Sequence, residues 1–467
     1  MGTVLRLEQF KNARSDGIED WKRVTFMAVE KVIERLWTSS EGKDFEQISD
    51  ELLKEGQQIT GALLGAVLKT RGAEELKRAQ YPCPGCGNIL HKRCDKPRDI
   101  ETRHGKVGVE RPYFHCGSCE QGHFPFDDAV GLAPQKKQYD LQRAASRLLS
   151  QLPYEEAAAI FYELTKVPIT NYTMHEIGGR VGDIATVEAV LPSREKVKAT
   201  IEKLNGNKTW RPVLVVAADG ALLPTRPETG TRKGKRGPGE YKEAKGFRIY
   251  LVGQERIEQI MSWHQIATED EFGQSIRFAA TLIPTDDVRV CLIGDGAPWI
   301  WNHLKAAFPM GREVLDYYHC SEHIHKLAEL QYPKDKDHRA LWIESTMARL
   351  FSGDVQAVIW GLERMQAETA TTAEEIRKLI GYLENNEHRI DYKALRRGQY
   401  PLGSGGIESA NKFICHVRMK RSGAWWYKIN GNKVLRIRCA YYNATFDEVF
   451  AKYKRLQRSG KQPRPNA

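Results

Sequence analysis

Two aspartates in this chain end apolar runs of the same design. Asp219 follows the run from Val213 to Ala218, Asp295 follows the run from Val290 to Gly294, and a glycine comes directly after each aspartate. A buried carboxylate is costly unless it is paired or binds a metal. One Asp-Gly alone is also typical of a turn. Two of them at strand ends predict acids at one edge of a sheet, where a cation can bind between them.

A third acid, Glu408, lies in the segment GSGGIESANK, where Ser404 is expected to cap a helix. Carboxylates suit Mg²⁺ or Mn²⁺, which keep waters and take phosphate oxygens as further ligands. Two such ions can activate an attacking hydroxyl and stabilise the departing one in a phosphoryl displacement. Asp219, Asp295 and Glu408 are therefore the predicted catalytic acids, and they would hold two Mg²⁺ (or Mn²⁺) ions.

Cysteine spacing predicts a second metal site. Four of the nine cysteines form two Cys-x-x-Cys pairs: Cys83 with Cys86, and Cys116 with Cys119. This pattern is typical of a zinc ribbon, in which four thiolates hold one structural Zn²⁺ and a hairpin, here near Gly105, joins the pairs. A redox pair is the alternative. The 29 residues between the pairs exceed the common spacing, so one ligand could be replaced by Cys94, His91 or His115.

The segments around the acids alternate between strand-like and helix-like patterns. Strands are expected at Val213–Ala217, Arg248–Val252, Glu258–Ile266, Val288–Ile293 and Glu313–Tyr318. Helices are expected at Glu271–Ala280, Pro298–Phe308 and Ser321–Leu330. Three strands followed by alternating helices and strands predict an RNase H-like core with a mixed sheet. A basic loop over residues 229–246 would join the first two strands, and residues 335–397 predict helices without strands.

The predicted fold class is multidomain α/β, because 467 residues exceed one ordinary core. The expected order is a helical N-terminal region (1–80), a zinc ribbon (81–131), a helical segment (132–204), an RNase H-like catalytic core (205–330 and 400–445) with a helical insertion (331–399), and a basic tail (446–467). In the N-terminal region, the helices are expected at Asp20–Trp37 and Phe45–Leu68.

Residues 132–204 contain a candidate helix-turn-helix. Pro153 opens one helix, a break follows at Val167-Pro168, and Thr173-x-x-Glu176 predicts a capping box that opens a second helix. Such a pair can place its second helix in the major groove of DNA. Any helical hairpin has a similar pattern, so plain packing is the alternative.

The net charge of +11 is concentrated near the C-terminus, where 14 Lys and Arg face two acids from Asn411 onward. A basic segment on a nearly neutral body indicates a polyanion partner, here double-stranded DNA, although a solvated tail is the alternative. Basic residues next to tryptophans suit phosphate contact with base stacking. The candidate DNA-binding residues are Arg418, Lys420, Arg421, Trp425 and Trp426, with one tryptophan expected in the core.

Composition excludes several other classes of protein. No stretch approaches the length of apolar residues that spans a bilayer, and the N-terminus lacks the apolar segment of a secretory signal. We therefore expect a cytoplasmic protein with no membrane partner. Disulfides are a poor explanation for an odd number of cysteines in that compartment.

Several stretches together resemble the ISKra-type bacterial insertion-sequence transposases, which are DDE enzymes of the RNase H-like superfamily. They run in order from about residue 81 to 440: CPGCG, GKVGVERPYFHCGSC, PFDDAVGL, VVAADG, GDGAPWIW, VLDYYHCSEH and GSGGIESANKFICHVRMKRSGAWW. The resemblance implies a homo-oligomer that acts on the terminal inverted repeats of its element and associates with the bacterial nucleoid when bound to DNA.

The same resemblance implies roles for individual residues. Asp219, Asp295 and Glu408 would be the DDE acids, and residues 331–399 the insertion before the helix of the third acid. Asp316-x-x-His319 resembles an accessory motif of related transposases. His319 or His323 would approach the scissile phosphate, unless these histidines are structural.

Three functions remain open on the sequence. The first is a DNA strand transferase, and the second is a non-catalytic DNA-binding protein descended from such an enzyme. The third is a metal-dependent nuclease that cuts without joining. All three acids are intact, which favours an enzyme, but the sequence does not separate cutting from cutting and joining.

Overall fold

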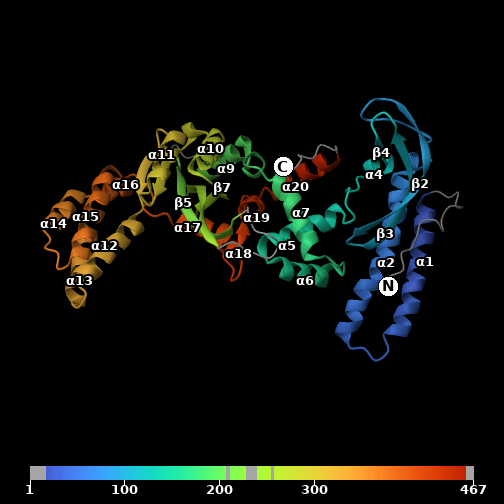
Figure 1. Cartoon of the computed structure of the whole chain (residues 1–467), viewed down its shortest axis with the longest axis horizontal. Coiled ribbons are helices and arrows are strands. Elements are labelled where there is room, and N and C mark those ends of the chain that lie inside the picture. Colours follow the sequence, from blue (N-terminus) through green and yellow to red (C-terminus); the bar gives the residue numbers. More distant parts are fainter. Residues whose placement is uncertain (1–16, 207–210, 228–238, 254–256, 459–467) are drawn as a thin grey trace. The chain divides into compact units, whose positions relative to one another are not determined.

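The computed structural model describes residues 17–206, 211–227, 239–253 and 257–458 (Figure 1). The chain divides into two compact units, one formed by Met1–Val181 with Phe450–Ala467 and the other by Gly182–Val449. Two helices, α7 (Asn171–Ile184) and α20 (Phe446–Arg458), contribute residues to both units. Across the described ranges, no helix combines the length and the apolar character needed to cross a membrane.

The first unit begins with a helical hairpin of α1 (Gly17–Ser39) and α2 (Phe45–Arg71), followed by the short α3 (Ala73–Lys77). A capping box starts α2, because the Asp44 carboxylate accepts from the Gln47 backbone N–H at 2.9 Å and the Gln47 side chain accepts from the Asp44 N–H. Both helices predicted for this region are confirmed, and each extends a few residues beyond the prediction.

A four-stranded antiparallel sheet follows, in the order β1-β2-β3-β4. Its strands are β1 (Gln80–Pro82), β2 (Ile89–Thr102), β3 (Gly105–Cys116) and β4 (Gln121–His123). Thr102 pairs with Gly105 across a two-residue turn, and Gly105 has a φ of +79°, which favours glycine. The predicted hairpin near Gly105 is confirmed.

Helices make up the rest of this unit: α4 (Pro125–Val130), α5 (Tyr139–Gln151), α6 (Tyr154–Thr165) and α7. A short turn joins α6 to α7, as predicted for the helix-turn-helix candidate. The capping box predicted at Thr173 is wrong, because α7 begins at Asn171 and the Thr173 N–H donates to Thr170 Oγ1 at 3.1 Å. Thr170 therefore supplies the cap. DNA binding by these helices stays a prediction.

The second unit is built on a mixed sheet in the order β7-β6-β5-β8-β9. The strands are β5 (Val213–Arg226), β6 (Glu240–Val252), β7 (Ile257–Ile266), β8 (Arg289–Gly294), β9 (Arg312–Leu315) and the short β10 (Trp426–Tyr427), which pairs with β5. β5, β6 and β7 run antiparallel, whereas β8 and β9 run parallel to β5. All five predicted strands are present.

Three of these strands differ clearly from the predicted bounds. β5 continues to Arg226, so placing Asp219 at the end of its strand was wrong: Asp219 lies within β5 and pairs with Gly246 of β6. β6 begins at Glu240, so residues 240–246 of the expected basic loop are strand, and residues 228–238 of that loop lie outside the described part. β9 ends at Leu315, so extending it to Tyr318 was wrong. Asp316 stops the strand there, because its side chain accepts from the N–H groups of Tyr318 and His319 and so starts a helix.

Helices lie on both sides of this sheet in Figure 1, with α10 (Glu269–Thr281) and α11 (Pro298–Ala307) on one side and α17 (Gly405–Ala410) and α19 (Lys428–Tyr442) on the other. The unit also contains α8 (Val187–Val190), α9 (Arg194–Asn205), the 3₁₀ turn η2 (Thr285–Asp287), the π-helix η4 (Asn411–His416) and α18 (Val417–Met419).

A run of helices separates β9 from α17. It consists of α12 (Tyr317–Gln331), α13 (Lys336–Phe351), α14 (Val355–Glu363), α15 (Ala370–Asn385), the 3₁₀ turn η3 (Glu387–Arg389) and α16 (Tyr392–Arg397). The helices predicted for residues 335–397 are confirmed. The run begins at Tyr317, immediately after β9.

The region expected to be a basic tail is in part a packed helix. α20 covers Phe446–Arg458, and its Tyr453 is fully buried, with its hydroxyl donating to Gln142 Oε1 at 2.6 Å and its ring edge-on to Tyr139. Apolar residues at helical spacing explain this, because they form one buried stripe among the lysines and arginines. The tail prediction is wrong for residues 446–458, and residues 459–467 lie outside the described part.

We predict that Tyr453→Ala destabilises the first unit by about 3 kcal/mol, because it removes a large buried ring and the hydroxyl that donates to the Gln142 Oε1. Hydrogen exchange of the amides in α5 and α20 would measure the loss. The matched control is Arg455→Ala, which changes an exposed residue of the same helix and should stay within about 0.5 kcal/mol of the parent protein. Equal protection in both variants would contradict the packed helix.

Candidate functional site

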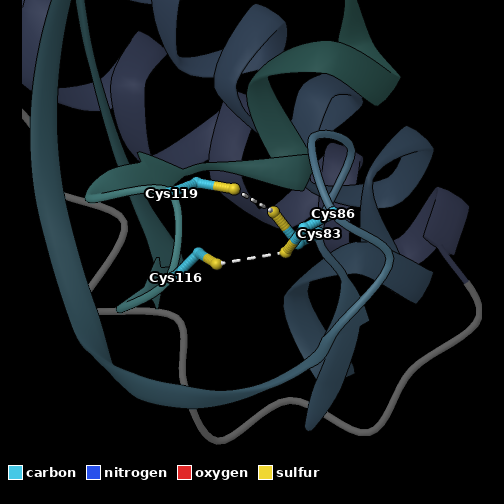
Figure 2. A group of neighbouring side chains, drawn as sticks. All are labelled: Cys83, Cys86, Cys116 and Cys119. Carbon is cyan, nitrogen blue, oxygen red and sulfur yellow. Dashed lines mark hydrogen bonds between the residues drawn. The ribbon is translucent and has the colours of Figure 1, made fainter.

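Four cysteine sulfurs of the first unit come together between β1 and β2 and between β3 and β4 (Figure 2). The Sγ atoms of Cys83 and Cys119 are 3.8 Å apart, those of Cys86 and Cys116 are 3.5 Å apart, and all four lie within 4.8 Å of one another. Zn–S bonds of about 2.3 Å in a tetrahedron place sulfurs roughly 3.8 Å apart. The cluster could therefore hold a metal ion such as zinc.

Tight backbone turns shape this cluster. The Cys83 N–H donates to the Asn88 carbonyl and the Gly87 N–H donates to the Cys83 carbonyl, both at 2.8 Å, with Gly87 at a φ of +76°. A Cβ on Gly85 would lie 3.1 Å from the Cys119 Sγ, so glycine leaves room for the sulfur. The backbone N–H of Cys86 and then that of Gly85 hold the pKa of the Cys83 thiol down to about 6.

None of the three proposed substitute ligands (Cys94, His91 and His115) belongs to the cluster. Cys94 and His91 are exposed on β2. His123, which the sequence analysis did not consider, lies beside the cluster, with its Nε2 3.7 Å from the Cys83 Sγ. The four candidate ligands therefore all come from the two Cys-x-x-Cys pairs.

The paired acids of the second unit owe their placement to strand register. β5 and β8 run parallel with Ala217 opposite Ile293, and Asp219 and Asp295 each lie two residues beyond that pair. Neighbouring strands are about 4.8 Å apart, and residues two apart share a face. The register therefore brings Asp219, which lies within β5, beside Asp295, which directly follows the last residue of β8.

The pKa of Asp219 is shifted by burial and by the charged and polar groups around it. Burial, together with the charges of Asp295 and Glu408, raises the pKa of Asp219 to about 6, although the Gly220 N–H and His319 act in the opposite direction. Among the described residues, the four cysteines form a group placed to hold a metal ion, and the three acids do not form such a group.

Glycine and arginine dock the helix that carries Glu408. A Cβ on Gly406 would lie 2.5 Å from the Tyr250 ring on β6, so only glycine allows this approach. Arg248 of β6 donates to the Gly406 carbonyl at 2.6 Å. Ser404 precedes α17, but its hydroxyl donates to Glu408 Oε1 at 3.3 Å and makes no cap bond, so the predicted side-chain cap is wrong.

Asp316, predicted as an accessory residue, is fully buried and joins two distant segments. One carboxylate oxygen accepts from the N–H groups at the start of α12, and the other accepts from the Ser404 N–H. The Tyr317 N–H donates to the Leu402 carbonyl at 2.9 Å beside it. Asp316 therefore fixes the start of the Glu408 helix beside the end of β9.

Asn411 is a site residue that the sequence analysis missed. Its Nδ2 donates to Asp219 Oδ2 at 2.7 Å, and it lies three residues after Glu408, on the same helical face. That spacing was the available signal. Asn411 opens the π-helix η4, whose carbonyls at Phe413 and Ile414 accept from the buried Arg438. Such distortions frequently occur at functional sites.

His264 lies in the interior behind this segment. It is fully buried on β7, and its two ring nitrogens and the Asn411 Oδ1 make no hydrogen bond within the described structure. Burial lowers the pKa of His264 to about 3, and Asn411 acts in the opposite direction. A neutral imidazole therefore lies close to the residue that holds Asp219.

The two accessory histidines have different surroundings. His319 is close enough to Asp219 to lower the pKa of that acid, and its Nδ1 lies 3.4 Å from Glu322 Oε2. His323 packs on the Tyr382 ring of α15, with centroids 4.4 Å apart, and the Tyr382 hydroxyl donates to the Asp295 carbonyl at 3.0 Å. The pKa of His323 is lowered by burial. His323 therefore supports the Asp295 loop through Tyr382.

The predicted DNA-binding residues separate into two groups. Arg418 and Trp426 are buried against each other, 4.8 Å from guanidinium to ring, and the Trp426 indole donates to the Met419 carbonyl. Their burial indicates packing and not DNA contact, and one tryptophan is in the core as expected. Lys420, Arg421 and Trp425 are exposed, and DNA contact by these three stays a prediction.

No protein-family model matches this chain, and no curated protein matches its sequence. The transposase resemblance therefore stays a prediction that depends on the residues quoted for it.

We predict that the purified protein carries about one zinc per chain, and that Cys83→Ser or Cys116→Ser loses the metal and lowers the thermal stability of the first unit, because metal binding contributes folding free energy. Elemental analysis of the intact protein measures the stoichiometry. Cys94→Ser is the control, since Cys94 is exposed and outside the cluster. A folded protein that is metal-free after gentle purification would contradict the site.

A second prediction concerns the metal-free protein and pH. The folded-state pKa of Asp219, about 6, lies above its ordinary value of 3.8, so folding favours the protonated acid. Its contribution is fully present below about pH 4 and is lost as pH rises through about 6, a change of roughly 3 kcal/mol. Asp219→Asn should lack this loss. Urea unfolding of the second unit at pH 4.5 and about 7.5 would compare the two, and parallel pH profiles would sink the assignment.

Proposed function

We propose that this protein is a DDE-type DNA transposase that cuts the ends of an insertion sequence and joins them to new DNA. Asp219, Asp295 and Glu408 would hold two Mg²⁺ or Mn²⁺ ions. Bound there, the ions would supply charge for activating the attacking oxygen and stabilising the departing one. The three carboxylates are oxygen donors of the type these ions prefer.

The observation that carries this proposal is the register between β5 and β8. It aligns Asp219 with Asp295, although 75 residues separate them in sequence. Glu408 is on the helix whose next turn, at Asn411, bonds directly to Asp219. Three acids from distant segments that lie near one another repel, and a cation relieves that repulsion.

The remaining architecture is compatible with an RNase H-like core. Three antiparallel strands, a helix, and two parallel strands separated by a helix agree with the predicted order, and a helical run precedes α17. Double-stranded DNA would contact the exposed Lys420, Arg421 and Trp425 beyond Glu408. The cysteine cluster would hold its zinc as a structural ion, because all four ligands come from the protein.

Two other functions share parts of this site. A nuclease that cuts without joining needs the same acids. A non-catalytic DNA-binding protein does not, and it would gain stability by losing one of three mutually repelling carboxylates. This chain keeps all three acids, and Asn411 and Asp316 hold Asp219 and the helix of Glu408 in place. That arrangement favours an enzyme over a non-catalytic DNA-binding protein.

We predict that Asp219→Asn, Asp295→Asn and Glu408→Gln each reduce DNA cleavage at least about 100-fold while DNA binding stays within about threefold, because each acid holds metal and none is needed to contact DNA. The substrate is plasmid DNA that carries the sequences flanking the coding region, with Mg²⁺ added. Gel analysis separates nicked, cut and joined products. The control is Asp270→Asn, an exposed acid of α10.

Each outcome of this assay separates the candidate functions. Cut and joined products that vanish in the acid variants support the transposase, and cut products alone identify a nuclease. Tight binding without any cleavage identifies a non-catalytic DNA-binding protein. If the acid variants cleave as the parent protein does, the catalytic assignment fails.

A further inference from the structure

A hollow of about 890 Å³ opens in the second unit, away from the acids. Val288, Arg289 and Val290 line it, so it lies where β8 begins, whereas Asp295 directly follows the last residue of that strand. At about 3.3 Å per residue, the path along β8 from Arg289 to Asp295 covers roughly 20 Å. The hollow is therefore a separate place on the sheet, and no part of the acid site lines it.

Four arginines from four segments line the hollow: Arg194 of α9, Arg211 before β5, Arg277 of α10 and Arg289 of β8. Asp286 is the only acid in the lining. Throughout the described ranges, none of the four guanidinium groups lies within 4.0 Å of a carboxylate oxygen. Four positive charges in one hollow without ion pairs repel one another, so an anionic ligand would stabilise them.

The bonds that these arginines do make go to backbone carbonyls. Arg194 donates to the Thr281 carbonyl at 2.7 Å and Arg211 to that of Asp286 at 3.4 Å. Arg289 donates to the carbonyls of Arg211 and Gly398 at 3.1 and 2.8 Å. A guanidinium has five N–H donors in a planar fork, so these bonds hold the side chains in place and leave donors for a ligand.

Much of the rest of the lining is apolar or aromatic. Ile283, Val288 and Phe308 are buried there, Met310 is almost fully exposed at its rim, and the Arg289 guanidinium lies 5.3 Å from the Tyr400 ring centre. Small-molecule pockets of this kind have volumes of about 300–1,000 Å³. Cationic forks beside an apolar wall and a ring suit a ligand with a phosphate at one end and a sugar and base at the other.

We propose that this hollow binds nucleotide phosphates, either the phosphodiesters of a DNA strand or the phosphates of a free nucleotide. Arginine is the side chain suited to bidentate phosphate contact, and all four cations here are arginine. A DNA segment bound in it would lie roughly 20 Å from the acids, or about six base pairs of duplex away. The site needs neither the acids nor their metal, so it goes beyond the proposed catalytic function.

The test is a triple variant, Arg194→Gln, Arg211→Gln and Arg277→Gln, in the full chain. All three side chains are exposed, so their loss should leave the fold intact. The half-buried Arg289 is left unchanged because it donates hydrogen bonds to two backbone carbonyls. Binding is measured without divalent metal, so that cleavage plays no part. One arm titrates a labelled DNA duplex at several salt concentrations, and the other titrates ATP by calorimetry.

Loss of three phosphate contacts should lower the slope of log K against log[salt] by about 2–3 and weaken DNA binding at low salt by at least about tenfold. Binding in the ATP arm should fall by a similar factor if free nucleotides are the source. The matched control, Lys334→Gln with Lys336→Gln and Lys378→Gln, removes the same charge from exposed positions elsewhere. It should leave both arms unchanged.

The arms distinguish the sources of phosphate. A change in the DNA arm alone assigns phosphodiesters, a change in the ATP arm alone assigns free nucleotides, and changes in both support the shared phosphate site. Equal effects of the two triple variants, or no effect in either arm, overturn the proposal. If thermal unfolding shows that the triple variant is destabilised, Arg277→Gln alone replaces it, because Arg277 makes no hydrogen bond within the described ranges; its expected slope change is about 0.9.

Discussion

The parallel pairing of β5 with β8 is the constraint on which the second unit depends. Parallel strands cannot be joined by a tight turn, so β6, β7 and α10 form the crossover between them. The pairing aligns Asp219 with Asp295 and makes their repulsion a fixed feature of the fold. Burial and those like charges raise the pKa of Asp219, and the Gly220 N–H and the Asn411 amide donate hydrogen bonds to its carboxylate.

The third acid, Glu408, is positioned near the other two by hydrogen bonds and not by strand register. After β9 the chain forms a long run of helices and comes back to the sheet at residues 402–404. The buried Asp316 carboxylate accepts hydrogen bonds both from the start of α12, where this run begins, and from Ser404, where it ends. These bonds hold the start of α17 beside the end of β9. Tyr382 adds one contact from this run to the Asp295 carbonyl. The helical run thus supports the acid site at two places.

The cysteine cluster of the first unit follows a simpler logic. Each pair lies on a tight turn between adjacent strands, and one hairpin brings the two turns together. The arginine hollow differs from both sites, because its four cations come from separate elements and lack the regular spacing that marks the cysteines. Sites of that kind leave no signature in the sequence. They emerge only when the sheet and its flanking helices have packed.

Local patterns were readable from the sequence because they depend on neighbours along the chain. The apolar strands before Asp219 and Asp295, the Cys-x-x-Cys turns and the hairpin at Gly105 belong to this class, since strand period and turn chemistry act over a few residues. Bounds were less certain where two local signals competed. Asp316 ended β9 early by capping α12, and Thr170 displaced Thr173 as the cap of α7.

Tertiary packing alone decided which polar side chains became part of a site. The sequence predicts that Arg418 contacts DNA together with Lys420 and Arg421, but in the structure it is buried against Trp426. Asn411 was not predicted as a site residue, yet it bonds to Asp219 across 192 residues. The start of the basic tail became the packed helix α20. Burial of a side chain depends on which face of its element meets a neighbour, and that is set by docking between segments far apart in the chain.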